Sequence, residues 1–545
     1  MTAAHAARRK TTQILKSKLA TGCLSLVLAA VHTAALAADM ILVGAFDLGP
    51  GGNPQKFNPL AASAGFTWYN KYFGTLALYD VGFEKISGDL AESWTMAPDG
   101  RLITFKLRKG VKWHDGKPFS AKDVKFTLEL AKNPDSGSLF VARLDGLSHV
   151  STPDPLTVVL TLKSPNAPIL DTLTSLMMLP EHHLGGVAPK ELRNADWWRR
   201  NPVGTGPFKW SRYEPDQYVE LLANADYYRG RPKLDKLVNR YFKDSGAAAM
   251  ALQAGEIQFS YLTLDQVKDA KASSSYRIVS GPSQVLNYLG FNNQEARFQD
   301  VRVRQAMLMA LDREAIIKYL YGGQAQAGQC VYTQALFVPS DVKAYGYDPQ
   351  KARQLLREAG WERIKGEPIE LITYYGDQLS KDVLATIQAQ LASVGVHVVP
   401  RFLDGPTFGK LVDSGKFALA FAGAGNGPEP DTLGPFMESA HTPPKGVNRM
   451  RVNLPEIDKL FDTGRQETSA AKRPAHYQSI CRITNAHLPW APLWESKRFG
   501  GIAKTVQNMV WTPAPAGGRY QDHAENWSIQ RHAPQGSDKP TLALR

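Results

Sequence analysis

The sequence predicts an α/β protein of two or three domains, and three observations support this prediction. The chain has 545 residues, of which 43% are apolar, and this is more than one hydrophobic core ordinarily organises. Strand-like and helix-like patterns alternate along the chain without a repeat of about 20–50 residues, which excludes solenoids and propellers. Residues 369–402 show the order strand, helix, strand, which is typical of a parallel sheet with a right-handed crossover.

The first 37 residues have the composition of a secretory signal peptide. They contain five basic residues and no acidic one, and an uncharged run ends in Ala35-Leu36-Ala37. This order of basic, apolar and small residues predicts export and cleavage near Ala37, with an uncleaved membrane anchor as the alternative. Cleavage would lower the formal net charge from +13 to +8, since 13 − 5 = 8. No later stretch is apolar enough over the length of a bilayer, so we expect a soluble exported protein.

Residues 88–205 are expected to form an α+β unit. Apolar residues alternate with polar ones around Phe105 and again around Leu160, which predicts two half-buried strands. Between them, Ser120 and Asp123 are spaced as a capping box ahead of a helix with one apolar face. The glycine- and proline-rich stretch 201–207 is expected to cross into another domain.

The second half of the chain carries clear helix-start signals. Asp300 and Asp312 are expected N-caps, and Asp348 with Pro349 begins a helix that Gly360 ends. The expected elements are helices over 301–311, 313–320 and 349–359, a strand over 369–375, a helix over 380–394, strands over 396–402 and 417–421, and a glycine-rich exit over 422–431.

Candidate ligand-binding residues lie at the predicted strand ends, because open parallel sheets bind ligands beyond the carboxyl ends of their strands. One strand ends in two tyrosines followed by Asp377, and the glycine-rich exit would let a ligand approach the backbone closely. Aromatic clusters near the mature N-terminus and near residue 490 add rings suited to a binding pocket. A place in a turn or in the core is the alternative for each residue. The candidates are Trp68, Tyr69, Tyr374, Tyr375, Phe421, Asn426, Asp431 and Trp494.

The sequence shows no signature of catalysis or of a cofactor. It lacks GxSxG, HExxH, a Walker A motif and a GxGxxG that opens a helix, so we predict no catalytic residue. His182 and His183 are adjacent, and neighbouring side chains diverge on a helix, so a metal-chelating pair is not expected. Basic residues are interspersed with acidic ones, which indicates a solvated surface and not a nucleic-acid interface.

Cys330 and Cys481 are the two cysteines beyond the predicted signal peptide. They are too far apart in sequence for a CxxC motif. An exported location permits them to pair. A disulfide and two buried free thiols are both compatible with the sequence.

Several strings occur in one order along nearly the whole mature chain. They are AESW at 91–94, the run 105–124 that contains WHDG, VGTGPF at 203–208, LGFN at 289–292, DVRVRQA at 300–306, ALDR at 310–313 and the helix region 347–361. In combination these strings resemble the family 5 extracellular solute-binding proteins of ABC importers, whose best-known members bind dipeptides, oligopeptides and nickel chelates.

The resemblance implies a two-lobed periplasmic binding protein (type II, cluster C-like) with an additional α+β domain. The implied function is that of a monomeric, non-enzymatic receptor without cofactor or metal. It would bind a peptide or another small solute between its lobes and deliver it, by clamshell closure, to an ABC permease in the inner membrane. The implied division is a signal peptide (1–37), lobe I (38–87, 206–300 and 501–530), the additional domain (88–205), lobe II (301–500) and a loose tail (531–545).

One departure from the family pattern concerns the ligand. Peptide-binding members often carry Trp-x-x-Asp at a strand exit, and here the string is Phe421-Ala422-Gly423-Ala424. Ala424 cannot anchor an α-amino group. Either Glu429 or Asp431 takes that role, or the ligand is an opine, a sugar conjugate or a metal chelate. A secreted hydrolase, suggested by aromatic strand ends and scattered carboxylates, is the alternative from another class.

Overall fold

The computed structural model describes residues 39–46, 57–61, 68–80, 82–269, 275–510 and 523–530. The predicted signal peptide and the predicted loose tail lie outside these residues. Contacts divide the chain into residues 1–39 and residues 40–545, and the fold described below is that of the second unit. Within the described ranges, no helix is both long enough and apolar enough to cross a membrane.

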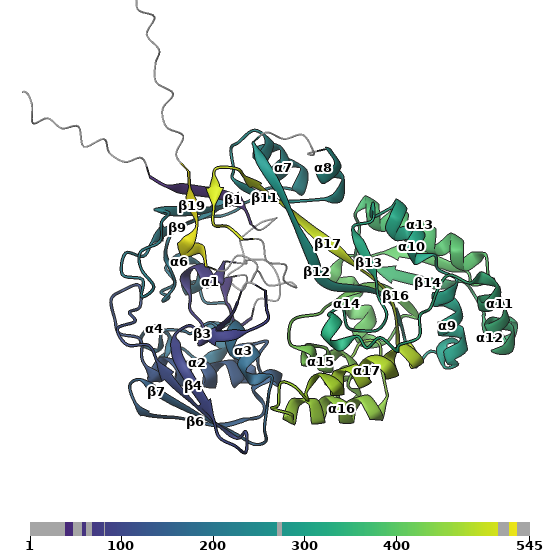
Figure 1. The fold of residues 1–545 in the computed structure, drawn as a ribbon, viewed down its shortest axis with the longest axis horizontal. Helices are drawn as coiled ribbons and strands as arrows, with labels where there is room; N and C mark the ends of the chain where they lie inside the picture. The colour runs from purple at the N-terminus through teal and green to yellow at the C-terminus, as the bar shows by residue number, and fades with distance from the viewer. Residues whose placement is uncertain are drawn as a thin grey trace, which may run out of the picture. The chain divides into compact units, whose positions relative to one another are not determined.

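The protein mixes helices and strands along its whole described length (Figure 1), as the alternating patterns predicted. The strands are β1 Ile41–Ala45, β2 Ala77–Tyr79, β3 Ile86–Gly88, β4 Ala91–Met96, β5 Leu102–Leu107, β6 Leu147–Asp154, β7 Thr157–Leu162, β8 Phe208–Glu214, β9 Tyr218–Ala223, β10 Lys236–Arg240, β11 Phe259–Leu262, β12 Tyr276–Phe291, β13 Ala325–Ala327, β14 Ile369–Thr373, β15 Val398–Phe402, β16 Leu419–Gly425, β17 Trp490–Ala503, β18 Val506–Gln507 and β19 Ser528–Ile529. The helices are α1 Tyr69–Tyr72, α2 Ala121–Lys132, α3 Ile169–Ser175, α4 Glu181–Leu184, α5 Pro189–Leu192, α6 Trp197–Arg200, α7 Ser245–Gln253, α8 Leu264–Asp269, α9 Val301–Met309, α10 Arg313–Tyr319, α11 Pro349–Glu358, α12 Trp361–Ile364, α13 Gln378–Ala392, α14 Gly405–Ser414, α15 Gly434–Met437, α16 Pro455–Gln466 and α17 Pro474–His487.

Among the described residues, eleven strands form one large sheet. Its order is β15-β14-β16-β12-β17-β11-β1-β10-β9-β8, with β13 added against β17. The long strands β12 and β17 run antiparallel side by side through its middle (Figure 1). The first part of β12 pairs with the part of β17 that adjoins β11, and its last part pairs with β16. β12 and β17 therefore belong to both halves of the sheet. One half contains β11, β1, β10, β9 and β8, and the other contains β16, β14 and β15.

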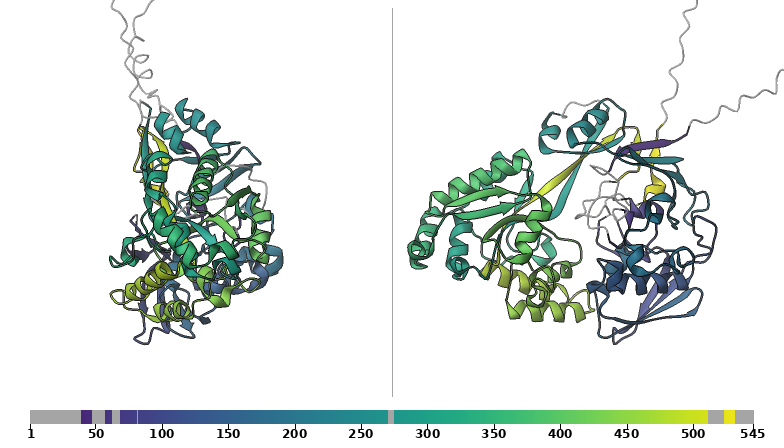
Figure 2. Two further views of the ribbon diagram at one scale, coloured as in Figure 1. Left: turned by 90° about the vertical axis from the view of Figure 1, so that its right-hand side faces the viewer. Right: turned by 180° about the vertical axis from the view of Figure 1, so that it is seen from behind.

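A separate four-stranded antiparallel sheet, in the order β4-β5-β7-β6, is formed by the described residues between 91 and 162. β5 and β7 confirm the two predicted half-buried strands. The predicted capping box starts α2, where the Ser120 N–H donates to Asp123 Oδ2 at 2.9 Å. The buried face of α2, with Val124 and Leu128, packs on β6 and β7. The sheet and α2 form one blue part of the chain in the view from behind (Figure 2).

The stretch 201–207 packs tightly against the end of α1. A Cβ on Gly204 would lie 1.6 Å from the carbonyl oxygen of Tyr72, and one on Gly206 would lie 2.7 Å from Tyr72 Cα. His114 holds the other side: its Nδ1 accepts from the Gly204 N–H at 3.2 Å, and its Nε2 lies 3.0 Å from the Gly206 oxygen. Desolvation lowers the pKa of His114 to about 4, so the neutral ring that these two contacts require is the form present near pH 7.

The predicted helix starts in the second half are confirmed. Asp300, Asp312 and Asp348 accept backbone N–H bonds at the starts of α9, α10 and α11, and Gly360 after α11 has a φ of +71°. β14 and β15 are parallel and joined by α13, which confirms the predicted strand, helix, strand unit. α13 begins at Gln378 and not at Ser380, because Asp377 accepts from the Ser380 N–H and so caps the helix earlier.

The glycine-rich segment after Phe421 differs from the prediction. β16 continues to Gly425, and its residues 422–425 pair with β12. Small residues permit this, because β16 lies between two neighbouring strands with cores on both faces. Leu419 and Phe421 belong to one core, while Ala420 and Ala422 belong to the core on the opposite face. The predicted glycine-rich exit therefore begins later, after Gly425.

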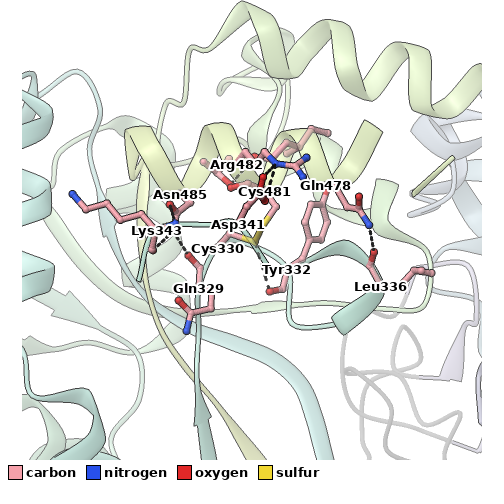
Figure 3. The surroundings of a disulfide bond; sticks show 12 residues. Gln329, Cys330, Tyr332, Leu336, Asp341, Lys343, Gln478, Cys481, Arg482 and Asn485 are labelled. Atoms are coloured by element: carbon pink, nitrogen blue, oxygen red, sulfur yellow. Dashed lines mark hydrogen bonds and ion pairs between the residues drawn. A yellow bond between two sulfur atoms is a disulfide. The ribbon is translucent and has the colours of Figure 1, made fainter. Parts of the chain in front are cut away.

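Cys330 and Cys481 form a disulfide (Figure 3). Their Cα atoms are 5.4 Å apart, although 151 positions separate them in sequence. Beside the bond, the Asn485 amide donates to the carbonyl oxygens of Gln329 at 2.8 Å and of Lys343 at 3.0 Å. The loop after β13 is thus attached to α17 by one covalent link and by side-chain hydrogen bonds.

Candidate functional site

A cavity of about 700 Å³ lies between segments from both halves of the large sheet. This volume falls within the range of about 300–1,000 Å³ that is typical of small-molecule sites. One wall is formed by β11 and the start of α8, the opposite wall by the residues after α10 and the start of α13, and a third side by β17. The lining residues are Phe46, Tyr261, Leu262, Thr263, Leu264, Asp265, Leu320, Tyr321, Gln324, Asp377, Gln378, Leu379, Ser496, Lys497, Arg498 and Phe499.

The apolar part of the lining rests on packed aromatic rings. The Phe46 ring stacks on Phe259 with 4.7 Å between centroids, and Phe259 contacts Tyr261 edge-on at 5.2 Å. On the opposite wall, Tyr321 lies 5.4 Å from the buried ring of Trp494. Rings held by such contacts change position little, so these walls offer a fixed apolar surface.

The charged part of the lining carries both signs. Asp265 and Asp377 are carboxylates, and Lys497 and Arg498 are cations on the adjoining strand. Asp377 is held in place because it accepts from the Ser380 N–H at 3.0 Å and from its hydroxyl at 2.7 Å. Lys497 Nζ lies 3.2 Å from Gln324 Oε1. The cavity can therefore bind an anionic and a cationic group of one ligand.

Four of the sequence-predicted aromatic residues form a chain of ring contacts that reaches the cavity wall. Centroid distances are 4.4 Å for Tyr374 to Tyr375, 5.6 Å for Tyr375 to Phe421 and 6.4 Å for Phe421 to Trp494. Trp494 in turn contacts Tyr321, which lines the cavity. Tyr374 is 40% exposed, Phe421 and Trp494 are buried, and burial raises the pKa of Tyr375. The structure brings these four together behind the described lining and not within it.

Trp68 and Tyr69, from the N-terminal aromatic cluster, support the other wall. Trp68 is fully buried, with its ring 4.7 Å from that of Phe46. Tyr69 is half-buried and packs on the same core. Asn426 lies elsewhere: its side chain is buried, and its backbone N–H donates to the Gln284 oxygen at 2.6 Å.

Glu429 and Asp431 lie in a buried group of ion pairs, away from the described lining of the cavity. Glu429 is bound by the Arg473 guanidinium, one contact being 2.8 Å. Asp431 lies 3.0 Å from Arg465, which also contacts Glu438. Desolvation, against the attraction of Arg465, raises the pKa of Asp431 to about 8. Both carboxylates have guanidinium partners, so the structure does not place either of them to meet an α-amino group in this cavity.

Sequence reasoning missed most of the polar lining residues. Asp377 could be identified from the sequence, because it follows a strand whose end the sequence indicated. Asp265, Gln324, Lys497 and Arg498 had no such signal. Their common position depends on which segments lie beside β17, and this pairing joins residues that are far apart in the sequence.

Comparisons with known proteins identify similar chains over most of the length. Residues 85–444, more than half of the chain, match the profile of the bacterial extracellular solute-binding proteins, family 5, middle part. A Brucella melitensis protein is 50% identical over 492 residues, covering 89% of this chain and 93% of its own length; its assignment as an ABC transporter peptide-binding protein is itself provisional.

Two solved structures are similar at 25% identity. The oligopeptide-binding protein AppA of Bacillus subtilis in complex with a nonapeptide has a TM-score of 0.77, and NikZ of Campylobacter jejuni in complex with Ni(L-His) has a TM-score of 0.78. Each covers 90% of this chain and 99% of its own chain.

Proposed function

Because the chain belongs to the bacterial extracellular solute-binding proteins of family 5, we propose that it is a periplasmic receptor that binds a peptide and delivers it to an ABC importer. The Brucella relative with a peptide-binding assignment and the likeness to AppA with a bound nonapeptide support the choice of ligand. The observation on this chain that carries the proposal is the cavity lined by fixed aromatic rings and by charges of both signs.

The two charged ends of a peptide match the charges of both signs in this lining. At neutral pH its α-amino end is a cation and its α-carboxylate an anion. Asp377 would receive the amine, because Asp265 already pairs with Lys268 at 3.1 Å, and Lys497 or Arg498 would bind the carboxylate. Charge-assisted hydrogen bonds of this kind contribute about 1.5–3 kcal/mol each. The apolar rings would accept side chains of varied shape, which suits a receptor for peptides of different sequence.

The opine, the sugar conjugate and the metal chelate are the non-peptide alternatives. Each would have to satisfy the same lining, which carries charges of both signs. We propose a peptide ahead of them because α-amino and α-carboxylate groups occur in every free peptide. No enzymatic activity and no nucleic-acid binding is proposed.

The proposed working cycle is that of a monomer made of two lobes and an additional domain. The proposed lobe I comprises 38–87, 206–300 and 501–530, and lobe II comprises 301–500. The additional domain comprises 88–205, and its separate four-stranded sheet supports this division. A ligand in the cavity would contact both proposed lobes at once and favour the state in which they are close together. Cleavage near Ala37 would accompany export, and the mass of the periplasmic protein would test it.

Isothermal titration calorimetry with short peptides tests the proposal. Arg498→Gln and Asp377→Asn should each weaken binding by about tenfold or more, because each removes one charge from the cavity. Arg401→Gln is the matched control, since Arg401 pairs with Glu370 on the exposed edge of the sheet. Peptides with acetylated and amidated ends should bind more weakly than free peptides.

The proposal fails if capped and free peptides bind equally and if Arg498→Gln and Asp377→Asn both retain the affinity of the wild type. Binding of an opine or a sugar conjugate by a protein that binds no peptide would also contradict it.

A further inference from the structure

Three potential metal ligands converge outside the described lining of the cavity. His182 Nε2 lies 2.7 Å and His183 Nε2 lies 3.0 Å from the same atom, Asp115 Oδ2, and the three ligand atoms lie within 4.8 Å of one another. The expectation that the adjacent histidines diverge is wrong. α4 is a single turn, the two ring centroids are only 4.5 Å apart, and both rings face the carboxylate of another segment.

The carboxylate is fixed from its own side. Asp115 Oδ1 accepts the Lys117 N–H at 3.1 Å, so Oδ2 is left to face the histidines. The surrounding turn is closed by the Trp113 N–H, which donates to the Lys117 oxygen at 2.8 Å, and Gly116 has a φ of +89°. The orientation of this ligand therefore does not depend on the two imidazole rings.

The imidazole rings are also held by neighbours. The His182 ring lies 6.1 Å from Trp113, and the His183 ring lies 6.1 Å from Trp197. The start of α4 is attached to α2 because the Glu181 N–H donates to Asp123 Oδ1 at 3.1 Å. Positioning of ligands by such outer contacts is what raises the metal affinity of a site.

The spacing suits an ion that enters between the three atoms. Tetrahedral ligands about 2.0–2.1 Å from a metal are about 3.3 Å apart. The observed separations of 2.7 and 3.0 Å would have to widen by less than about 1 Å. Between 27% and 36% of each side chain is exposed, so water can reach the remaining coordination positions.

We propose that Asp115, His182 and His183 form a binding site for a divalent transition-metal ion, with Zn²⁺, Ni²⁺ and Cu²⁺ as the class of ligand. Two imidazole nitrogens and one carboxylate oxygen suit these ions, whereas Mg²⁺ and Ca²⁺ prefer oxygen ligands alone. A bound ion would link α4 to the turn before Lys117. The adjacent His114 contacts the crossover, so the ion would stabilise this part of the chain. The proposed site uses none of the residues that line the cavity.

Calorimetric titration of Zn²⁺ and Mg²⁺ into protein without a histidine tag, pre-treated with a chelator, tests the proposal. The wild type should bind one Zn²⁺ and show a higher Tm with Zn²⁺ present. Asp115→Asn and the double variant His182→Ala/His183→Ala should weaken Zn²⁺ binding by about tenfold or more and lose the Tm shift. His149→Ala is the matched control, because His149 is an exposed histidine on β6 of the same sheet unit, and it should bind like the wild type.

Asp115→Asn retains the oxygen that caps the turn, and its Tm in the presence of chelator shows whether the variant is folded. The proposal is overturned if the wild type binds no Zn²⁺. It is equally overturned if the folded Asp115→Asn and double variants bind Zn²⁺ as tightly as the wild type, or if Mg²⁺ binds as tightly as Zn²⁺.

Discussion

Gly204 lies where the crossover touches α1, and the contact leaves no room for a side chain. A Cβ there would come within 1.6 Å of the Tyr72 oxygen, which is a backbone atom and cannot rotate away. We expect Gly204→Ala to lower the free energy of unfolding by about 3 kcal/mol or more, because overpacking forces the backbone to move. The loss can be measured by chemical denaturation.

Gly186→Ala is the control for this substitution. A Cβ at Gly186 would meet nothing within 4 Å, so we expect its stability to change by less than about 1 kcal/mol. Equal stability of both variants would show that the crossover and α1 are not packed as described.

Glu495 is a second residue with a measurable consequence. It lies on β17 beside the cavity residue Ser496, and the backbone N–H of Gln284 is its hydrogen-bond donor. Desolvation raises its pKa from 4.5 to about 7. The folded state therefore holds this proton more tightly than the unfolded state between about pH 4.5 and pH 7. Stability from this group is present below about pH 4.5 and is lost as the pH rises towards 7, by up to about 3 kcal/mol.

Glu495→Gln removes this titration and keeps an oxygen for the Gln284 N–H. We expect the stability of the variant, relative to the wild type, to increase between pH 5 and pH 8 in denaturation curves. A constant difference across that range would contradict the raised pKa. Glu370→Gln, which alters an exposed carboxylate, is the control.

At the scale of elements, the disulfide joins parts of the chain that local contacts would leave separate. It links the loop after β13 to α17 across 151 positions. Replacing both cysteines by alanine should lower the stability of this region by about 2–5 kcal/mol, because the unfolded chain regains conformational freedom. Thermal denaturation with and without reductant measures this change.

The wild type in reductant should match the double alanine variant, and reductant should not alter that variant further. If the wild type kept its full stability after complete reduction, verified by thiol labelling, the disulfide would contribute nothing to stability.

Elements with a local signal were predictable from the sequence. Asp300, Asp348 and the Ser120–Asp123 pair act on backbone groups within three residues, so their sequence spacing was sufficient to place α9, α11 and α2. The end of β16 was not predictable in this way. Ala422-Gly423-Ala424-Gly425 resembles a turn locally, but pairing with β12 extends the strand through it. Tertiary pairing thus overrode local preference.

The candidate site was likewise predictable only where a local signal marks it in the sequence. Tyr375 and Asp377 follow β14, and the rule about strand ends led to a segment beside the cavity, which Asp377 lines. Of the aromatic residues predicted there, Phe421 and Trp494 are buried, because rings with large apolar surface are more stable in the core than in solvent, whereas Tyr374 is 40% exposed and lies outside the described lining. The contact between Asp115 and His182 could not be predicted from the sequence, since 67 positions separate the two residues.

At the scale of the whole molecule, the family of the chain and the cavity both support a receptor that binds a peptide. The long strands β12 and β17 extend through both halves of the large sheet, and the cavity beside β17 is lined from both halves. A ligand that binds there has contacts with segments that only the folded chain brings together. Ligand binding should therefore raise the Tm of the whole protein in proportion to the logarithm of ligand concentration above the Kd.

Native mass spectrometry of the protein recovered from the periplasm of its own organism shows whether the ligand that it carries is a peptide. We expect additional masses that correspond to peptides, and these masses should be released on denaturation and should fragment at peptide bonds. A protein that consistently carries an opine, a sugar conjugate or a metal chelate, and that does not exchange it for added peptides, would not be a peptide receptor.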